Sequence, residues 1–342
     1  MGQELRKSLT DLMTWYEANK RDLPWRQNRD PYRIWISETM LQQTTTRAVI
    51  PYFEKFLTQF PTLYDLARAP LEQVLSHWAG LGYYSRARNL HRSAQALVAA
   101  GGFPENFESL MEFPGFGPYT SRAVAALAFG QEVGVIDGNV IRVLCRYKGW
   151  PVAWWKSSER NKLQTEIDLW AQQGFCPATI NQAVMELGAS LCSPQRPSCF
   201  QCPLRTNCKA EKMEKPDHLP LKKPRRQSEI WLWEVQLFSH QNHFALIPNT
   251  YAPFLRGQWI FPGQVQQLNS KPKSYDFRHN ITHYDIFVTL VSPQPTMESV
   301  VEAEGQWIRP EELSLWNPAS LLKKTLNAKD GKEAKCEAEH WV

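Results

Sequence analysis

The sequence predicts a multidomain protein in which an all-helical part precedes an α+β part. Up to about residue 210, apolar residues recur at three- and four-residue spacing, as on the buried face of a helix. From residue 229 onward, short runs of alternating, β-branched and aromatic residues are typical of strands. The length of 342 residues favours about two domains, each large enough to bury a core.

The helical part is predicted to span residues 1–210. Its clearest helical stretches are residues 48–60, 85–100 and 121–129, with Pro and Gly punctuating the segments between them. Residues 211–228 combine several prolines with a Lys/Arg run and few apolar side chains, so we expect an exposed linker there.

The α+β part is predicted to span residues 229–322, and residues 323–342 are polar enough that we expect a disordered tail. The predicted strands are residues 230–238, 243–248, 258–263 and 285–291.

Composition indicates an intracellular protein with reduced thiols. The chain has seven cysteines, and we identify neither a signal peptide nor a long apolar run in it. We therefore expect a cytoplasmic protein, nucleoid-associated if bacterial, with no membrane partner. The net charge of +5 is compatible with a nucleic-acid partner but does not identify one.

Four cysteines, Cys192, Cys199, Cys202 and Cys208, stand at C-x6-C-x2-C-x5-C spacing in one short, Pro-rich loop. Four soft ligands so close in sequence can enclose a single metal centre. Zinc sites usually pair their cysteines as two knuckles, and only one such pair exists here. The spacing therefore favours a [4Fe–4S] cluster over tetrahedral zinc, which stays open as the alternative, and disulfides rank lower.

Residues 113–120, FPGFGPYT, put Gly115 and Gly117 in a tight turn that leads into a helix. Backbone N–H groups beside glycine can approach a phosphate closely, and a helix N-terminus favours an anion. A plain connector between two helices is an equal alternative. Asp137 follows an apolar run in VIDGNV, and by itself it is most simply the N-cap of the next helix.

Glu38 lies in a predicted amphipathic helix beside Ile34, Trp35, Met40 and Leu41. Packing against these apolar residues would raise the pKa of its carboxyl group and let it act as an acid. A solvated glutamate is the simpler interpretation of this segment taken alone.

Two further segments carry side chains suited to DNA. Gln42 and Gln43 are either surface amides or residues that enter a base stack. Tyr83 and Tyr84 stand close to Arg86, which suits base contacts flanked by phosphate contacts. Core aromatics beside solvated arginines would have the same pattern.

Taken together, LPWR, SETMLQQT, GLGYYSRARNL, PGFGPYT, VIDGNV and the four-cysteine loop resemble, in content and order, the adenine DNA glycosylases of the MutY family. The resemblance is dense over roughly residues 10–210. It implies a helix-hairpin-helix glycosylase core in two lobes, with DNA held across the cleft and the first residues beside the cluster-bearing lobe. It also implies a [4Fe–4S] cluster in place of zinc.

Matched motif by motif, Glu38 resembles the general acid that protonates adenine and afterwards activates water. Asp137 resembles the carboxylate that stabilises the oxocarbenium-like sugar. Two carboxylates suit this reaction because leaving-group protonation and positive charge at the sugar must both be stabilised. The resemblance also implies support near the carboxylates from Tyr119 and Asn139, and an adenine pocket near Trp25, Arg26 and Gln182.

The resemblance further implies that Gln43 and Tyr83 wedge into the duplex as the adenine flips out. We expect Arg86, Gly115 and Gly117 to add contacts to the DNA backbone.

Rival functions differ in chemistry. An endonuclease III type enzyme, which acts on pyrimidine lesions, shares the hairpin, the aspartate and the cluster. Its hairpin helix carries a lysine nucleophile where this chain has Tyr119, so a Schiff base with the sugar is not available and a monofunctional enzyme is favoured. A non-catalytic DNA-damage-binding protein and a zinc-stapled adaptor are the two rivals that involve no catalysis.

The last domain resembles the family less closely. In the family it is Nudix-like and reads 8-oxoguanine through an F-S-H type segment. Here Thr282 and His283 keep the hydroxyl and the imidazole, Ile281 replaces the aromatic, and the domain looks shortened. The implied partner is duplex DNA with adenine opposite 8-oxoguanine or guanine, and we expect a monomer.

Overall fold

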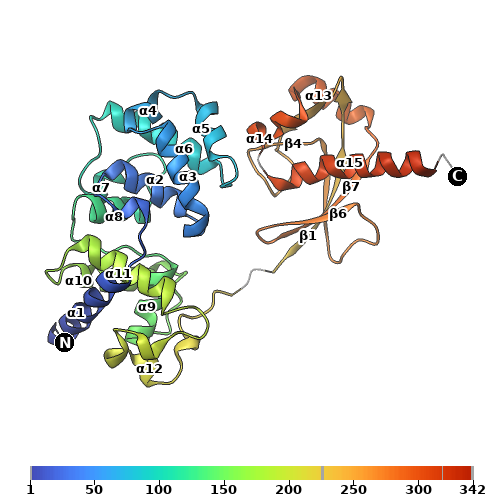
Figure 1. Ribbon diagram of the computed structural model, residues 1–342. Coiled ribbons are helices and arrows are strands. Elements are labelled where there is room, and N and C mark those ends of the chain that lie inside the picture. Colours follow the sequence, from blue (N-terminus) through green and yellow to red (C-terminus); the bar gives the residue numbers. More distant parts are fainter. Residues whose placement is uncertain (1, 225–226, 318, 340–342) are drawn as a thin grey trace. The chain divides into compact units, whose positions relative to one another are not determined.

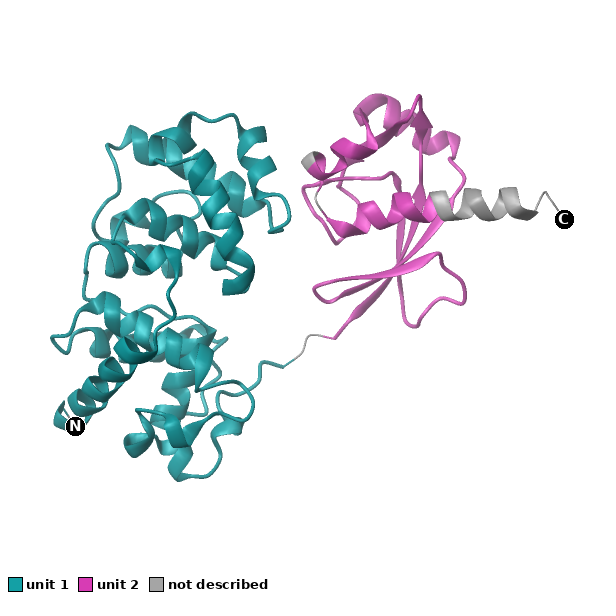
Figure 2. Ribbon diagram, in the orientation of Figure 1, with its two compact units in different colours: residues 1–224 teal, residues 225–342 magenta. Residues whose placement is uncertain are grey.

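The computed structural model describes residues 2–224, 227–317 and 319–339 (Figure 1). The chain divides into two compact units, residues 1–224 and 225–342 (Figure 2). The first unit is helical and the second is α+β, as the sequence predicts.

Two hydrophobic cores divide the first unit into two lobes. One core contains Trp35, Phe56 and Trp78. The other joins Leu9 of the N-terminal helix to Trp170 and to three of the four loop cysteines. The N-terminal helix therefore packs in the lobe that carries the cysteine loop, as expected.

The helices of the first unit are short and are joined by turns (Figure 1). They are α1 (Gly2–Asn19), α2 (Pro31–Leu41), α3 (Thr46–Gln59), α4 (Leu63–Arg68), α5 (Leu71–Trp78), α6 (Ser85–Ala99), α7 (Phe107–Leu110), α8 (Pro118–Ala128), α9 (Gly138–Lys148), α10 (Ser157–Ala171), α11 (Pro177–Ser190) and α12 (Lys209–Lys212).

Local sequence explains where the site-bearing helices begin. At α2, the Asp30 side chain accepts a hydrogen bond from the Tyr32 N–H at 2.9 Å, and Pro31 fills the first position. At α9, Asp137 accepts the Val140 N–H at 2.7 Å. The capping interaction therefore holds the Asp137 carboxylate at the positive end of a helix.

Most described residues of the predicted linker are exposed, but part of the segment is held against the first unit. Arg146 Nε donates to the Leu219 carbonyl at 2.9 Å, and Trp154 Nε1 donates to the Leu221 carbonyl at 3.0 Å. Leu219 itself is buried in the second lobe. The compact unit therefore extends to Pro224, because backbone carbonyls in this Pro-rich segment accept hydrogen bonds from long side chains of the core.

The second unit contains two small sheets. The first has the strand order β5-β1-β7-β6, with β1 and β7 parallel and the other pairs antiparallel. The second has the order β2-β3-β4, and β8 also pairs with β3. The strands are β1 (Glu229–Gln236), β2 (Ser239–His240), β3 (His243–Pro248), β4 (Trp259–Ile260), β5 (Gly263–Leu268), β6 (Phe277–Ile281), β7 (Tyr284–Val291) and β8 (Gln306–Ile308).

The described part of the second unit also contains the α-helices α13 (Pro295–Glu304), α14 (Leu313–Trp316) and α15 (Ser320–Glu339). The prediction of a disordered tail is wrong for residues 323–339, which are helical, while residues 340–342 lie outside the described part. Leu321 and Leu322 are fully buried in the core of this unit, and these apolar contacts order the start of a helix that is otherwise polar. None of the described helices is both long and apolar enough to cross a membrane.

Candidate active site

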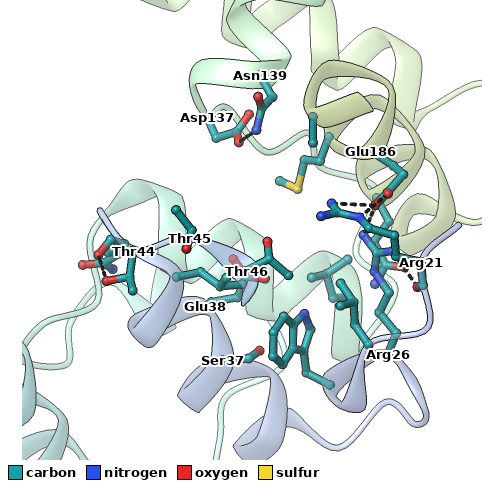
Figure 3. A pocket seen from close by; sticks show the side chains of 18 of the residues that line it. Arg21, Arg26, Ser37, Glu38, Thr44, Thr45, Thr46, Asp137, Asn139 and Glu186 are labelled. Atoms are coloured by element: carbon teal, nitrogen blue, oxygen red, sulfur yellow. Dashed lines mark hydrogen bonds and ion pairs between the residues drawn. The ribbon is translucent and has the colours of Figure 1, made fainter. Parts of the chain in front are cut away.

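A cavity of about 890 Å³ opens within the first unit and is lined by both lobes. Glu38 extends toward it from one wall, and Asp137 and Asn139 extend from the facing wall (Figure 3). Eight predicted site residues that are far apart in sequence meet here: Trp25, Arg26, Glu38, Gln43, Tyr119, Asp137, Asn139 and Gln182.

Glu38 occupies the buried face of α2 and is only 6% exposed. The interpretation of a solvated surface glutamate is therefore wrong. Burial raises the pKa of Glu38 to about 7, a hydrogen bond from Tyr119 opposes this rise, and the charge of Asp137 adds to it. A carboxyl group with this pKa holds a proton on a large fraction of molecules at neutral pH, as a general acid requires.

Asp137 is half-buried and strongly hydrogen-bonded. Besides the Val140 N–H, it accepts the side-chain amide of Asn139 at 2.9 Å. Burial raises the pKa of Asp137, and these hydrogen bonds oppose the rise by stabilising the anion. The two carboxyl groups therefore have different environments, one mainly apolar and one rich in donors, which favours an acid and an anion in the same cavity.

Arg142 connects this wall of the cavity to the cysteine loop. Its Nη2 donates to Asn139 Oδ1 and to the Gly188 carbonyl, both at 2.7 Å, and its Nε donates to the Cys192 carbonyl at 2.7 Å. A Cβ atom at Gly188 would lie 2.6 Å from Asn139 Cβ, so only glycine lets α11 approach α9 this closely. Asn139 is thus held by packing as well as by hydrogen bonds.

Another part of the cavity wall contains an ion-pair cluster of Glu186, Arg21 and Arg26. Motif matching identified only Arg26. Glu186 is 2% exposed, and its carboxylate accepts hydrogen bonds from Arg21 at 2.5 Å and from Arg26 at 2.7 Å (Figure 3). Burial acts to raise the pKa of Glu186, but the hydrogen bonds from the two arginines outweigh it and hold the pKa below its usual value. A single acidic residue in the apolar run AVMELGAS was the available sequence signal.

Gln182 lines the cavity beside this cluster, and its Oε1 accepts the Tyr16 hydroxyl at 2.7 Å. Trp25 is buried with its ring edge against Phe53, at 5.3 Å between ring centroids. Both residues are therefore fixed by the protein, and the polar wall of the cavity is already organised.

Gln43 and Tyr83 are both exposed and both have a left-handed backbone, with φ of 60° and 50°. The Tyr83 ring lies against the Arg86 guanidinium, 5.5 Å from its Cζ, but is still 60% exposed, so both side chains are accessible to a partner. Gln42 differs from Gln43, because its amide donates to Thr120 Oγ1 at 3.2 Å and joins the loop after α2 to α8.

The expected contact of Arg86 with DNA phosphate is not supported. Its two terminal nitrogens donate to five backbone carbonyls, those of Thr39, Met40, Gln42, Leu81 and Gly82. A guanidinium engaged in this way has no terminal nitrogen free to reach outward for a phosphate.

The hairpin before α8 keeps the geometry of a backbone anion site. Gly115 has φ of 80°, and a Cβ atom there would lie 2.8 Å from Asn89 Cβ, so this position requires glycine. Gly117 has extended backbone and open space around it, so it has no comparable requirement. The N–H groups that open α8 are available to an anion.

The four loop cysteines are free, partly buried thiols. In the described part of the chain, no three His, Cys, Asp or Glu side chains are arranged to hold a metal ion. A four-iron cluster separates its ligands further than one ion does, because each cysteine binds a different iron.

Buried positive charge beside the loop fits a negatively charged group. Arg146 is 2% exposed, and its Nη1 lies 3.3 Å from Cys192 Sγ and donates to the Ser193 carbonyl at 2.7 Å. Its carboxylate partner, Asp217, is 3.9 Å away with a side chain that is 55% exposed. A buried guanidinium needs closer compensation than this, and four thiolates around iron would supply it.

In the second unit, Thr282 and His283 form the turn between β6 and β7. Thr282 is exposed, with φ of 54°. The His283 side chain is 15% exposed, and its Nε2 lies 3.3 Å from Glu229 Oε1. Thr282 is therefore exposed at the turn, with its Oγ1 3.2 Å from His283 Nδ1, whereas the imidazole is largely covered.

Comparison with known proteins agrees with this geometry. Residues 36–171 match the family described as HhH-GPD superfamily base excision DNA repair protein. The chain is 44% identical over 224 residues to the adenine DNA glycosylase of Homo sapiens, an alignment that spans 61% of this chain and 40% of that protein. It is 36% identical over 259 residues to the adenine DNA glycosylase of Buchnera aphidicola subsp. Acyrthosiphon pisum (strain APS), which spans 73% of this chain and 72% of the relative. A solved thermostable thymine-DNA glycosylase matches with a TM-score of 0.55 and 28% identity, over 62% of this chain and 98% of that one.

Proposed function

The chain belongs to the adenine DNA glycosylase family, and we propose that it hydrolyses the N-glycosidic bond of adenine paired with 8-oxoguanine or guanine in duplex DNA. The observation that carries this proposal is the pairing of a buried Glu38, hydrogen-bonded to Tyr119, with a donor-rich Asp137 in one cavity. The cavity is large enough to accept a flipped nucleotide.

Glu38 is the proposed proton donor. With its pKa raised to about 7, it can protonate a ring nitrogen of the adenine as the bond to the sugar breaks, which makes the base a better leaving group. The carboxylate that remains can then take a proton from the attacking water. The Tyr119 hydroxyl, 2.5 Å from Glu38 Oε2, orients the carboxyl group in both steps.

Asp137 is the proposed stabiliser of the sugar cation. Its negative charge is held by Val140 N–H and Asn139, and positive charge develops at the sugar carbon as the base leaves. No amine occupies the Tyr119 position, so the sugar is not captured as a Schiff base, and the product is an intact strand with an abasic site.

The buried pair of Arg26 and Glu186 supports recognition of the base. Glu186 offers acceptors and Arg26 offers donors to a base within the cavity. Gln43 and Tyr83 are the proposed wedges that replace the flipped adenine in the stack, and the α8 N-terminus is the proposed phosphate contact.

Recognition of the base opposite adenine is assigned to the second unit, which we propose is Nudix-like and reads 8-oxoguanine. Thr282 is the better supported of the two proposed readers because its hydroxyl is exposed at a turn. His283 would have to leave its position beside Glu229 before its imidazole could contact a base.

We also propose that Cys192, Cys199, Cys202 and Cys208 hold a [4Fe–4S] cluster. Iron in this cluster would bind the four thiolates and so hold the Pro-rich loop in one conformation. Arg146, through Ser193, and Arg142, through Cys192, would hold that loop against α9.

The proposal is tested with duplexes that carry adenine opposite 8-oxoguanine, guanine, thymine or cytosine, incubated with and without alkali. We expect strand breaks only after alkali, and only with the first two duplexes. Breaks without alkali, or trapping of the protein on DNA by borohydride, would identify a lyase. A fifth duplex carries a damaged pyrimidine, and cleavage there in place of adenine would identify the endonuclease III type of activity.

A further inference from the structure

The two exposed residues that face away from the core, Gln43 and Tyr83, lie on different loops. Gln43 follows the end of α2, and Tyr83 precedes the start of α6. Both have a left-handed backbone, a conformation that a residue other than glycine keeps only when its surroundings hold it there. Contacts from the rest of the protein must therefore hold both loops.

One guanidinium contacts both loops. Arg86 Nη1 donates to the carbonyls of Thr39 at 2.8 Å, Met40 at 3.0 Å and Gln42 at 2.6 Å. These carbonyls belong to the end of α2 and to the residue just before Gln43. Carbonyls at a helix C-terminus lack partners within the helix, so Arg86 satisfies groups that would otherwise face inward without a donor.

The other nitrogen of Arg86 binds the second loop. Its Nη2 donates to the carbonyls of Leu81 at 3.3 Å and Gly82 at 3.2 Å, directly before Tyr83. The guanidinium also lies over the ring of Trp78, with its Cζ 5.3 Å from the ring centroid, and Trp78 is fully buried and donates its own N–H to the Gly82 carbonyl at 3.1 Å. Trp78 therefore packs against the guanidinium and binds one of the same carbonyls.

We propose that Arg86 is a positioning residue that joins the Gln43 loop to the Tyr83 loop, so that both side chains are presented to the duplex as one rigid pair. The inference rests on the proposed function. Base extrusion needs two side chains at a fixed separation, and a flexible pair would lose much of the benefit of wedging.

Lysine cannot replace arginine in this role. An ammonium group has three donors at one point, whereas the planar guanidinium reaches two loops from two separate nitrogens. A DNA phosphate contact would behave differently, because lysine keeps the charge that attracts a phosphate.

The test compares Arg86→Lys with Arg92→Lys, an exposed arginine on the same helix that is a matched control. Adenine release is measured in single turnover, and base extrusion is followed by 2-aminopurine fluorescence beside the target adenine. Affinity for undamaged duplex is measured over a range of salt. We expect Arg86→Lys to slow adenine release by about tenfold to a hundredfold and to reduce the extrusion signal. Its affinity for undamaged duplex should stay within about twofold, with an unchanged salt slope.

A second experiment tests whether the effect of Arg86→Lys requires the two wedge residues. In a Gln43→Ala/Tyr83→Ala background, Arg86→Lys should cause no further loss of extrusion, because the residues that it positions are gone. A further tenfold loss would contradict the inference. Normal extrusion by Arg86→Lys in the otherwise wild-type chain would also overturn it. So would a salt slope that the charge-removing variant Arg86→Gln reduces by about one, because that result would indicate a phosphate contact.

Hydrogen exchange in the wild-type protein keeps the inference testable if Arg86→Lys fails to fold. Residues 42–44 and 81–84 should open together, with similar protection, because one side chain ties them. Independent opening, at rates more than about tenfold apart, would overturn the inference. If the wild type releases no adenine, the proposed function fails, and the exchange data and salt slopes still decide the role of Arg86.

Discussion

Tyr119 donates its hydroxyl hydrogen to Glu38 Oε2 at 2.5 Å and so joins the first turn of α8 to the middle of α2. The hydrogen bond lowers the pKa of Glu38, but burial raises it by more, and the pKa of Glu38 settles at about 7. The pKa of Tyr119 lies well above its usual value, because of burial and then the nearby Glu38 charge, so its hydroxyl stays protonated and remains a donor. The pair is therefore arranged to deliver a proton near neutral pH.

We expect Tyr119→Phe to move the alkaline limb of the pH–rate profile to higher pH. In the wild type, adenine release should be constant below about pH 7 on this limb and fall above it, because Glu38 must be protonated. Phenylalanine removes the hydrogen bond that lowers the pKa of Glu38, so the acid form persists further. Single-turnover rates between about pH 5 and 9 test this, and a shift to lower pH would contradict it.

Glu38→Gln should slow adenine release by about 100- to 10,000-fold and leave mispair binding nearly unchanged. The amide keeps the shape of the side chain but cannot deliver a proton. Gel shift and single-turnover cleavage on the same duplex separate the two effects. Near-normal release would remove Glu38 from the acid role.

The same variant has a pH-dependent effect on stability. Because the folded pKa of Glu38, about 7, exceeds the usual 4.5, its contribution to stability is fully present below about pH 4.5 and is lost as pH rises through 7. We therefore expect Glu38→Gln to unfold at a higher temperature than the wild type at pH 8, with a smaller difference at pH 5. An equal difference at both values of pH would mean that Glu38 is not buried as a titrating acid.

Asp137→Asn should slow adenine release by about 100- to 1,000-fold, since a neutral amide stabilises the sugar cation less well. Asparagine caps a helix about as well as aspartate, so the bond to the Val140 N–H and the start of α9 should survive. Thermal unfolding checks the fold, and cleavage checks the chemistry. Loss of both together would mean that the residue acts mainly as a cap.

Purified protein should be yellow-brown and contain iron and sulfide. Cys199→Ser should lower soluble yield and DNA affinity, because the loop loses the ligation that orders it. Cys176→Ser, outside the loop, is the control and should resemble the wild type. A colourless, fully active protein that contains zinc would refute the cluster.

A chain that ends at Pro224 retains both helical cores and every residue of the cavity. We expect it to release adenine but to discriminate less between 8-oxoguanine and guanine, by about 1–3 kcal/mol. Thr282→Ala in the full chain should reproduce part of this loss, and Thr250→Ala, at another turn of the second unit, is its control. An unchanged ratio of rates on the two mispairs at equal salt, in both the truncated chain and Thr282→Ala, would remove Thr282 from lesion recognition.

Several features of the helical part were predictable from short-range pattern. Apolar spacing indicates the helices, and Asp137 before Gly138 indicates a cap, because both signals depend on residues within one or two turns. The motif resemblance added that Tyr119 lies near the two carboxylates, and the structure shows that it binds Glu38, which is 81 positions away and which no local signal connects to it.

Two segments carry ordering contacts that their composition does not indicate, because those contacts come from distant partners. The linker after residue 210 has the composition of exposed chain, yet Arg146 and Trp154 bind its carbonyls. The tail after residue 322 is polar, yet Leu321 and Leu322 order the start of α15 against the core. The composition of a segment indicates only how much apolar surface that segment can bury. In both segments the contacts that order the chain are made with residues outside the segment.

By itself, the sequence determined the helical character of residues 1–210, the presence of strands after residue 229 and the cap at Asp137, and the family resemblance added eight of the residues that line the cavity. Only the tertiary structure decided what the charged side chains do. Arg86 is polar and close to Tyr83, which is compatible with a phosphate contact, but the carbonyls that it binds lie up to 47 positions away. Glu186 likewise meets Arg21 across 165 positions. The partner of a charged group is decided by which chain segments packing brings together, and that depends on the whole fold.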